Sequence, residues 1–298
     1  MFDNEIKHYL DQHGYERFDP KAVLFDMDGV LYDSMPHHAK AWKRAMSDFG
    51  IHFTEADAYA TEGARGVDTI RDYVKRQLGR EVDEAEAQRM YDVKTRYFHE
   101  LPETRIFDGV RELMGWFASR GLSINVVTGS GQRPLILRLL HDFGDFLDEA
   151  HITTAYDVKN GKPAPDPYLA GLRKAGNLQP WQGIVVENAP LGVRAGVAAG
   201  CFTVAINSGP LPNEALAGEG SNLLFPPASA VSLLRWRTDF RPLGKFFPKK
   251  GLGRSRENGY LCKRHQSQTA LASVINHIKK KGYVRKLHLS QRYQSTFW

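Results

Sequence analysis

Two aspartates two residues apart are the strongest chemical signal in the sequence. Asp26 and Asp28, in Asp26-Met27-Asp28-Gly29, follow directly after the short apolar run 21–25. A carboxylate at the end of a strand can act as a covalent nucleophile toward phosphorus. The second carboxylate lies on the same side of an extended chain and can handle protons, while Gly29 lets the chain turn tightly. Taken alone, such a motif could also be a surface turn rich in Asp and Gly.

Three later segments place further polar groups where a strand would end. Thr128 and Gly129 follow the run INVV and offer a hydroxyl and backbone N–H groups to a phosphate. Lys162 precedes prolines that restrict its backbone, so its charge would need little reorganisation. Glu187 and Asn188 supply hard oxygen atoms, the ligands that Mg²⁺ prefers. Each of these groups alone could instead be a helix cap or a solvated side chain.

The elements that would position these groups alternate between strands and helices. Apolar runs with strand character cover 21–25, 124–127, 183–186 and 202–206, and helical patterns lie between them. This alternation predicts βαβ units and a parallel sheet. Ligands bind at the carboxyl edge of such a sheet, so the polar groups would converge in one pocket. Their conjunction favours an enzyme site over four unrelated turns.

A helical segment interrupts the alternation soon after the first strand. Residues 37–101 show helical periodicity and few strand signals. An insert of this length is typical of a second, smaller domain. Its place in the chain predicts that it covers the carboxyl edge of the sheet.

In this order, the four motifs resemble those of the haloacid dehalogenase superfamily, in particular its beta-phosphoglucomutase-like phosphatases with a helical cap inserted after the first motif. The resemblance covers about residues 20–230. It implies an α/β fold: a Rossmann-like parallel-sheet core with an inserted small all-helical cap domain. The composition of the chain adds an irregular basic C-terminal tail. The predicted parts are an N-terminal lead at 1–20, a core at 21–36 and 103–230, a cap at 37–102 and a poorly packed tail at 235–298.

The resemblance also implies a role for each motif. Asp26 would be the nucleophile and a Mg²⁺ ligand, and Asp28 the general acid and base, with its backbone carbonyl also on the metal. Glu187 and Asn188 would complete the magnesium site. Many relatives carry Asp at position 188, so Asn188 removes one negative charge near the ion. The residues that would bind the transferring phosphoryl group are Thr128, Gly129 and Lys162.

Four residues bear on the substrate by the same resemblance. His38 matches a position where beta-phosphoglucomutases carry a histidine that couples cap closure to proton transfer, although a helix-surface histidine is the alternative. Glu62 and Arg65 fall in a stretch that looks like the cap's specificity loop, where Arg65 could pair with a distal anionic or hydroxylated group. Ser130, after the phosphate-binding turn, is assigned with them. Mutases of the family carry a basic residue around position 62, so Glu62 favours net hydrolysis over isomerisation.

Charge divides the chain into two unequal parts. From residue 235 onward there are 16 Lys or Arg against two acidic residues, a net charge of +14, whereas residues 1–234 carry −8. Such a tail could neutralise several nucleic-acid phosphates, but it contains no recognisable binding module. A shifted reading frame, an irregular extension and a functional appendage stay open as explanations. We expect no nucleic-acid partner, and tail-mediated nucleic-acid binding is the weaker alternative function.

Composition limits the remaining classes. No run approaches the roughly 18 apolar residues that a membrane span needs, and the N-terminus carries charges where a secretory signal would be apolar. Cys201 and Cys262 are too few for a disulfide framework and lack metal-ligand spacing. We expect a cytoplasmic, monomeric Mg²⁺-dependent phosphohydrolase that acts on small phosphorylated metabolites, chiefly sugar phosphates, through an aspartyl-phosphate on Asp26. The alternative within the same family is a hexose-phosphate mutase of the beta-phosphoglucomutase type.

Overall fold

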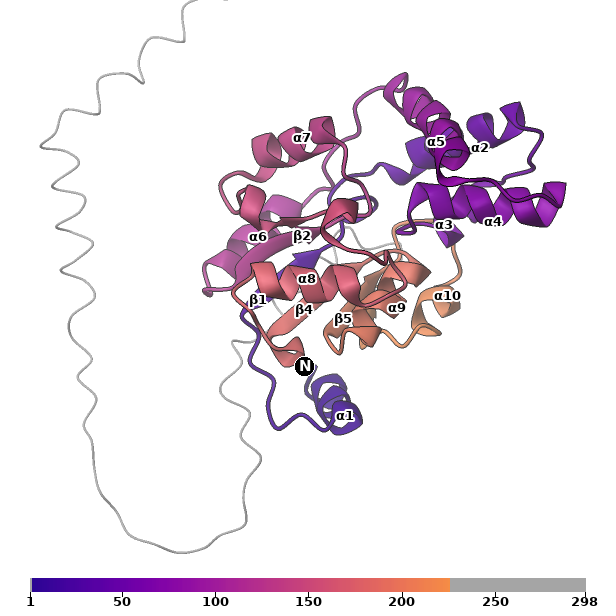
Figure 1. Ribbon diagram of the computed structural model, residues 1–298. Helices are drawn as coiled ribbons and strands as arrows, with labels where there is room; N and C mark the ends of the chain where they lie inside the picture. The colour runs from indigo at the N-terminus through magenta and orange to yellow at the C-terminus, as the bar shows by residue number, and fades with distance from the viewer. Residues whose placement is uncertain (1, 226–298) are drawn as a thin grey trace, which may run out of the picture. The chain divides into compact units, whose positions relative to one another are not determined.

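A six-stranded parallel sheet forms the centre of the computed structural model, which describes residues 2–225 (Figure 1). Its order is β3-β2-β1-β4-β5-β6, and every pairing is parallel. The predicted α/β fold with a Rossmann-like core is therefore confirmed. The predicted tail at 235–298, Cys262 and the last predicted core residues, 226–230, lie outside the described residues. The strands are β1 (Ala22–Phe25), β2 (Ser123–Val127), β3 (Ile152–Thr153), β4 (Gly183–Glu187), β5 (Phe202–Ile206) and β6 (Leu223–Phe225).

Helices separate the strands along the chain. The helices are α1 (Asp3–His13), α2 (Met35–Asp48), α3 (Glu55–Ala60), α4 (Gly66–Leu78), α5 (Glu84–His99), α6 (Val110–Ala118), α7 (Arg133–Phe143), α8 (Asp166–Lys174), α9 (Pro190–Ala198) and α10 (Asn213–Ala217). Single 3₁₀ turns are η1 (Glu149–His151), η2 (Ala155–Asp157) and η3 (Pro180–Gln182). Because β1 has β2 on one side and β4 on the other, the connections reverse at β1. Such a switch point is where an open sheet binds its ligands.

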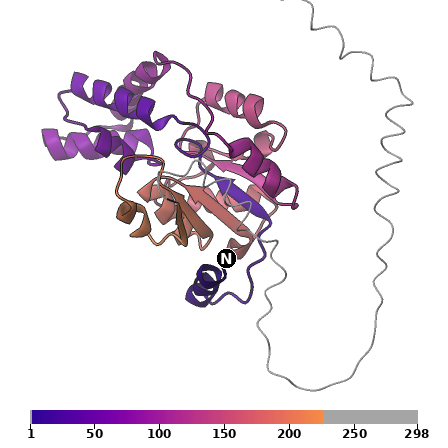
Figure 2. The ribbon, with the colours of Figure 1, turned by 180° about the vertical axis from the view of Figure 1, so that it is seen from behind.

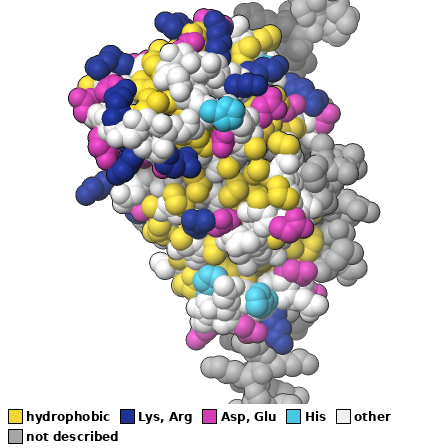
Figure 3. Space-filling model, turned by 90° about the vertical axis from the view of Figure 1, so that its right-hand side faces the viewer, with side chains coloured by type: hydrophobic (Ala, Val, Ile, Leu, Met, Phe, Trp, Pro, Cys, Tyr) yellow, Lys and Arg dark blue, Asp and Glu magenta, His cyan; other side chains and the backbone are white. Residues whose placement is uncertain are grey.

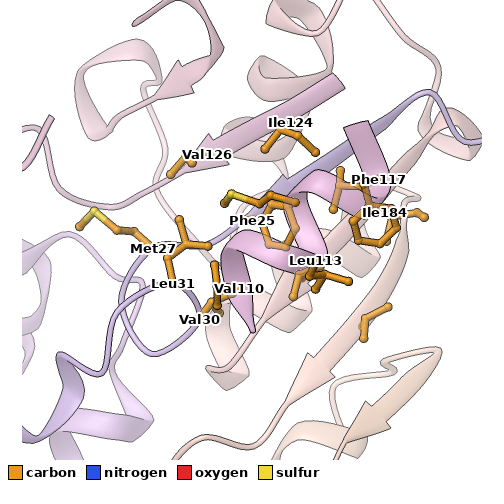
Figure 4. Packing of buried hydrophobic residues seen from close by; sticks show 14 of the residues in the cluster. Phe25, Met27, Val30, Leu31, Val110, Leu113, Phe117, Ile124, Val126 and Ile184 are labelled. Atoms are coloured by element: carbon orange, nitrogen blue, oxygen red, sulfur yellow. The ribbon is translucent and has the colours of Figure 1, made fainter. Parts of the chain in front are cut away.

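Side chains of β1 alternate between the two faces of the sheet. Val23 and Phe25 belong to the hydrophobic cluster that includes α6 and α7, whereas Ala22 and Leu24 belong to the cluster with α8 and α9. Figure 4 shows Phe25 beside Leu113 and Phe117 of α6. Both faces are thus covered, which explains why the strands read as continuous apolar runs rather than alternating ones.

The N-terminal lead contains a helix that the sequence reading left unassigned. In α1, Tyr9 is fully buried and its hydroxyl donates to the carbonyl oxygen of Gly200 at 2.7 Å. Ile6 joins Tyr9 in the main hydrophobic cluster, and Gly14 ends the helix at φ 65°. The first twenty residues therefore add to the core.

Helices α2 to α5 carry a hydrophobic cluster of their own, separate from those of the sheet. Figures 1 and 2 show these helices gathered on one side of the sheet. Residues of α2 and α5, including Trp42 and Lys94, line a cavity together with Asp28 and Gly129, which follow β1 and β2. The helices thus lie over the carboxyl edge of the sheet. The boundaries of the cap at 37–102 stay a prediction.

The exposed side of the helical insert carries paired charges. Arg71 lies 2.6 Å from Glu84, and Arg80 lies 2.8 Å from Glu86. In the view of Figure 3, Lys and Arg side chains lie interspersed with Asp and Glu. Ion pairs this exposed to solvent contribute little to the stability of the protein.

Within residues 2–225, no helix combines the length and apolarity needed to cross a membrane.

Candidate active site

Lys162 connects Asp26 to Glu187 at the carboxyl edge of the sheet. Its Nζ donates to Asp26 Oδ1 at 2.5 Å, to Glu187 Oε1 at 2.6 Å and to the carbonyl oxygen of Val127 at 3.2 Å. All three charged side chains are buried. Asp26 follows β1, Glu187 ends β4 and Lys162 precedes α8, so the sheet gathers groups that are far apart in the sequence.

Two buried carboxylates share one ammonium group in this cluster. Burial raises the pKa of Asp26 to about 8, with Lys162 opposing the shift and Glu187 adding to it. Burial would lower the pKa of Lys162, but Asp26 and Glu187 raise it above its ordinary value. The cluster carries more negative than positive charge when ionised, so a further cation would stabilise it.

Two buried oxygen atoms fit such a cation. Asp26 Oδ2 and Asn188 Oδ1 have no hydrogen-bond partner among residues 2–225. Both are hard oxygen donors of the kind that Mg²⁺ prefers. A Cβ atom on Gly29 would lie 2.0 Å from Asn188 Nδ2, so the glycine lets the amide approach the turn that carries the two aspartates.

Glu187 is engaged in other contacts. Its Oε1 accepts from Lys162 and from the Tyr168 hydroxyl at 2.7 Å, and its Oε2 accepts from the backbone N–H groups of Asn188 and Ala189. In the part of the chain that the structure describes, no three His, Cys, Asp or Glu side chains form a metal-binding group. Glu187 therefore positions Lys162 and the turn at 188–189 in this arrangement, and offers no free oxygen to an ion.

A glycine of α9 makes room for the Glu187 carboxylate, and its replacement is a test of that packing. A Cβ atom on Gly192 would lie 1.9 Å from Glu187 Oε1. We expect Gly192→Ala to displace the carboxylate and to lower the free energy of unfolding by about 1–3 kcal/mol, the usual cost of overpacking a core. Urea denaturation measures this loss. Gly115→Ala in α6 is the control, because its nearest neighbour, a ring atom of Phe146, lies 3.6 Å away; similar losses in both variants would contradict the prediction.

Asp28 lies in a second buried cluster, which helices α2 and α5 complete. Ser34 Oγ donates to Asp28 Oδ1 at 2.5 Å, and His38 Nε2 lies 3.1 Å from the same oxygen. Lys94 Nζ lies 2.7 Å from His38 Nδ1. An ammonium group can only donate, so Nδ1 accepts, and a neutral His38 carries its ring proton on Nε2, beside Asp28.

Opposing effects set the pKa values of this second cluster. Burial would raise the pKa of Asp28, but His38, Ser34 and Lys94 together hold it below its ordinary value. Burial, followed by Lys94, lowers the pKa of His38, so the ring is neutral at pH 7. Burial also lowers the pKa of Lys94 to about 8, against the attraction of Glu62 and Asp28. Asp28 is therefore ionised and ready to accept a proton.

Sequence reasoning did not identify Lys94. On α5, Lys94 follows the buried residues Ala87 and Met90 at helical spacing. A lysine on the apolar face of a predicted helix was therefore the signal in the sequence that could have identified it. Its Nζ lies between 5.2 and 5.6 Å from the centres of three aromatic rings, a distance at which a cation is attracted to the ring face. These rings belong to Trp42, Tyr91 and Phe98.

Replacing Lys94 tests whether burying its charged form lowers the stability of the protein. A lysine whose pKa falls on folding lowers stability below that pKa, and the penalty disappears as pH rises toward the ordinary lysine value of roughly 10.4. We therefore expect the free energy of unfolding of wild type to rise relative to that of Lys94→Met between pH about 8 and 10, by at most about 1.4 kcal/mol per pH unit. Urea denaturation of both proteins across this range measures the gain. A difference that shrinks with rising pH would contradict the buried-cation account.

A cavity of about 50 Å³ lies between the insert and Asp28. Burial and the charges of Asp28 and Asp26 raise the pKa of Glu62 well above its ordinary value. Thr128 is buried and is not among the lining residues, and its hydroxyl accepts from the backbone N–H of Ser130 at 3.0 Å. Of the residues predicted from the sequence, those in the lining besides Asp28 are His38, Glu62, Gly129 and Ser130.

Arg65 is the predicted substrate residue that does not join this cavity. Its Nε and Nη2 donate to the two carboxylate oxygens of Asp68 at 2.8 and 2.9 Å. It lines a neighbouring cavity instead of the one beside Asp28. The guanidinium charge is therefore already paired within the insert.

Comparison with known proteins identifies the family of the chain. Residues 20–200 match the family model of the haloacid dehalogenase-like hydrolases. The chain is 32% identical to hexitol phosphatase A of Escherichia coli over 188 residues, which is 63% of this chain and 83% of that protein. It is 29% identical to the beta-phosphoglucomutase of Bacillus subtilis over 198 residues, 63% of this chain and 84% of that protein.

A solved structure extends the similarity to the fold. A Bacteroides vulgatus protein provisionally named beta-phosphoglucomutase superposes with a TM-score of 0.75 at 45% identity, covering 80% of this chain and 96% of that one. The chain belongs to the haloacid dehalogenase-like hydrolase family. The predicted family resemblance is confirmed.

Proposed function

We propose that the chain is a Mg²⁺-dependent phosphohydrolase that removes phosphate from sugar phosphates through an aspartyl-phosphate on Asp26. One observation carries the proposal: Lys162 fixes one oxygen of buried Asp26, and the other oxygen is buried without a partner among the described residues. Once Asp26 is ionised, a carboxylate held in this way is oriented for attack on phosphorus. The similarity to a hexitol phosphatase supports the substrate class.

The reaction takes place in two displacements. The Asp26 carboxylate attacks phosphorus, so that a bond from Asp26 to phosphorus forms while the bond from phosphorus to the leaving oxygen breaks. Asp28, ionised in the free protein, takes up the proton of the bound phosphate monoester monoanion and passes it to the leaving oxygen. A water molecule then attacks phosphorus, Asp28 accepts its proton, and inorganic phosphate leaves as the Asp26 carboxylate is restored. His38 Nε2 lies 3.1 Å from Asp28 Oδ1, so a ring proton on this nitrogen faces the carboxylate that transfers protons.

The remaining residues bind and orient the phosphoryl group. Lys162 opposes negative charge on the phosphoryl oxygens, and the turn at 128–130 offers a hydroxyl and backbone N–H groups. Asp26 and Asn188 would hold Mg²⁺, with Glu187 behind them. The ion would stabilise charge on the same oxygens.

Hexose-phosphate isomerisation is the second candidate, because two of the compared proteins carry the name beta-phosphoglucomutase. A mutase must hold a sugar bisphosphate and release it in either orientation. The cavity beside Asp28 contains Glu62, and Lys94, the one Lys or Arg among its described lining residues, already contacts His38, which disfavours a second phosphate there. Interconversion of hexose 1- and 6-phosphates without phosphate release would favour the mutase.

Release of inorganic phosphate tests the main proposal. The screen uses hexose phosphates, hexitol phosphates and phosphoglycolate, each with added Mg²⁺ and with excess chelator. We expect release from the sugar and sugar-alcohol esters, and its loss with chelator. Failure to release phosphate from any of them with Mg²⁺ present would reject the proposed function.

A further inference from the structure

Tyr168 is a fully buried tyrosine whose hydroxyl lies in the cluster around Lys162. It belongs to the first turn of α8, shortly after Lys162 in the chain. Its hydroxyl donates to Glu187 Oε1 at 2.7 Å, and the same oxygen accepts from Lys162 Nζ at 2.6 Å. A buried tyrosine hydroxyl needs a hydrogen-bond partner, and this one has its partner inside the candidate active site. The hydroxyl is therefore part of the network that fixes the Asp26 carboxylate.

Donors fill the whole carboxylate of Glu187. Its Oε1 accepts from Lys162 and Tyr168. Its Oε2 accepts from the backbone N–H groups of Asn188 at 2.9 Å and Ala189 at 3.2 Å. A carboxylate has about four acceptor sites, so Tyr168 fills the last of them. Without this hydroxyl, a buried anion would have one empty acceptor site and would attract its remaining cation more strongly.

Lys162 divides its three N–H groups among three acceptors. Nζ lies 2.5 Å from Asp26 Oδ1, 2.6 Å from Glu187 Oε1 and 3.2 Å from the carbonyl oxygen of Val127. The bond to Val127 is the longest of the three, so a phosphoryl oxygen can replace that acceptor most easily. For this exchange the ammonium group must stay between the two carboxylates instead of moving toward Glu187.

We infer that Tyr168 is a positioning residue for phosphoryl transfer: by donating to Glu187 it weakens the attraction of Glu187 for Lys162 and keeps the ammonium group directed at Asp26 and the phosphoryl oxygens. The inference rests on the proposed function and adds a residue to it. Within residues 2–225 the Tyr168 hydroxyl donates to Glu187 Oε1 alone. Tyr168 therefore acts on the reaction through Glu187 and Lys162.

The ring of Tyr168 contributes separately from its hydroxyl. It belongs to the hydrophobic cluster that contains Leu24 and Val127, and its centre lies 5.2 Å from Lys162 Nζ. Tyr168→Phe keeps this packing and the contact between cation and ring, and removes a single oxygen atom. The substitution thus isolates the hydroxyl.

Tyr168→Phe is expected to lower kcat for phosphate release about tenfold, since losing an outer partner of an active site typically costs about 10- to 100-fold. KM should stay within about twofold, because the lost effect acts on charge that develops in the transition state. The assay uses the full-length protein with Mg²⁺ and the ester that wild type hydrolyses fastest in the screen above. The melting temperature checks folding.

Tyr9→Phe is the matched control. Tyr9 is also fully buried, and its hydroxyl also donates at 2.7 Å, but to the carbonyl oxygen of Gly200, outside the cluster. Loss of a buried tyrosine hydroxyl as such is therefore common to both variants. We expect Tyr9→Phe to keep kcat within about twofold of wild type.

A double-mutant cycle distinguishes action through Lys162 from an effect of packing. In Lys162→Met no ammonium group remains to be positioned, so adding Tyr168→Phe should change the residual kcat by less than about twofold. If Lys162→Met does not fold, the single variant and its Tyr9→Phe control decide. An equal fall in both backgrounds, an unchanged kcat in Tyr168→Phe, or the same fall in Tyr9→Phe would overturn the inference and leave the phosphatase proposal standing. Absence of phosphate release from every ester by wild type would overturn both.

Discussion

Asp26→Asn is expected to lower kcat for phosphate release by about 10⁴-fold or more, the range found when a catalytic nucleophile is removed. The amide is nearly the same size as the carboxylate but cannot form the aspartyl-phosphate. Its carbonyl oxygen can still accept from Lys162, which in wild type lies 2.5 Å from Asp26 Oδ1. The loss should therefore appear in turnover and not in folding, and steady-state phosphate release together with a urea titration measures the two.

The pH dependence of stability is a second measurement on Asp26→Asn. Because burial raises the pKa of Asp26 to about 8, the folded protein keeps a proton on Asp26 that the unfolded chain releases above pH about 4. The contribution of Asp26 to stability is thus present at low pH and is lost as pH rises to about 8. Asp26→Asn should be at least as stable as wild type at pH 8. Asp19→Asn, in an exposed pair with Lys21, is the matched control and should keep full activity; wild-type turnover in Asp26→Asn would show that Asp26 is not the nucleophile.

Lys162→Met is expected to cost both activity and stability. It leaves Asp26 and Glu187 buried without their shared cation, and removing one partner of a buried ion pair typically costs about 3–5 kcal/mol. Loss of a preorganised charge on the transferring group should lower kcat by about 10²- to 10³-fold. Urea denaturation and phosphate release measure the two effects.

The charges of the cluster also predict how the stability loss in Lys162→Met depends on pH. The raised pKa of Lys162 keeps its stabilising charge present up to the ordinary lysine range, and the contribution is lost only above it. Without Lys162, one of the two carboxylates takes up a proton more readily, so the deficit should be smaller at pH 5.5 than at pH 8. Lys21→Met, in an exposed pair, should change little. A deficit in Lys162→Met no larger than that of Lys21→Met would mean that the buried cluster is not a stabilising unit.

The sheet was predictable where its strands are long and buried. The runs 21–25, 124–127, 183–186 and 202–206 correspond to β1, β2, β4 and β5, because residues covered on both faces leave a continuous apolar signal. Strands β3 and β6 have two and three residues, too few for periodicity to register. Helix α1 was not predicted, since its contact with Gly200 depends on tertiary packing.

The site residues, like the strands and helices, could be predicted where the sheet positions them and not where tertiary packing does. Asp26, Lys162 and Glu187 could be placed together from sequence because the ends of parallel strands share one edge. Lys94 could not be placed in this way, because its contact with His38 depends on how α5 packs against α2. The engagement of Glu187 by Lys162, Tyr168 and the backbone likewise appears only in three dimensions. The catalytic and metal-binding roles of these residues stay predictions for the experiments above.

The two clusters have different origins in the chain. The groups around Asp26 all belong to the sheet and its loops, whereas His38 and Lys94, beside Asp28, belong to helices of the insert. A chimera that kept this sheet but received the insert of a relative without this histidine and lysine would keep Asp26, the proposed nucleophile, and lose the partners of Asp28, the proposed proton-transfer group. On these proposed roles the insert contributes to the chemistry as well as to recognition, and exchanging it between relatives would transplant reactivity along with substrate preference.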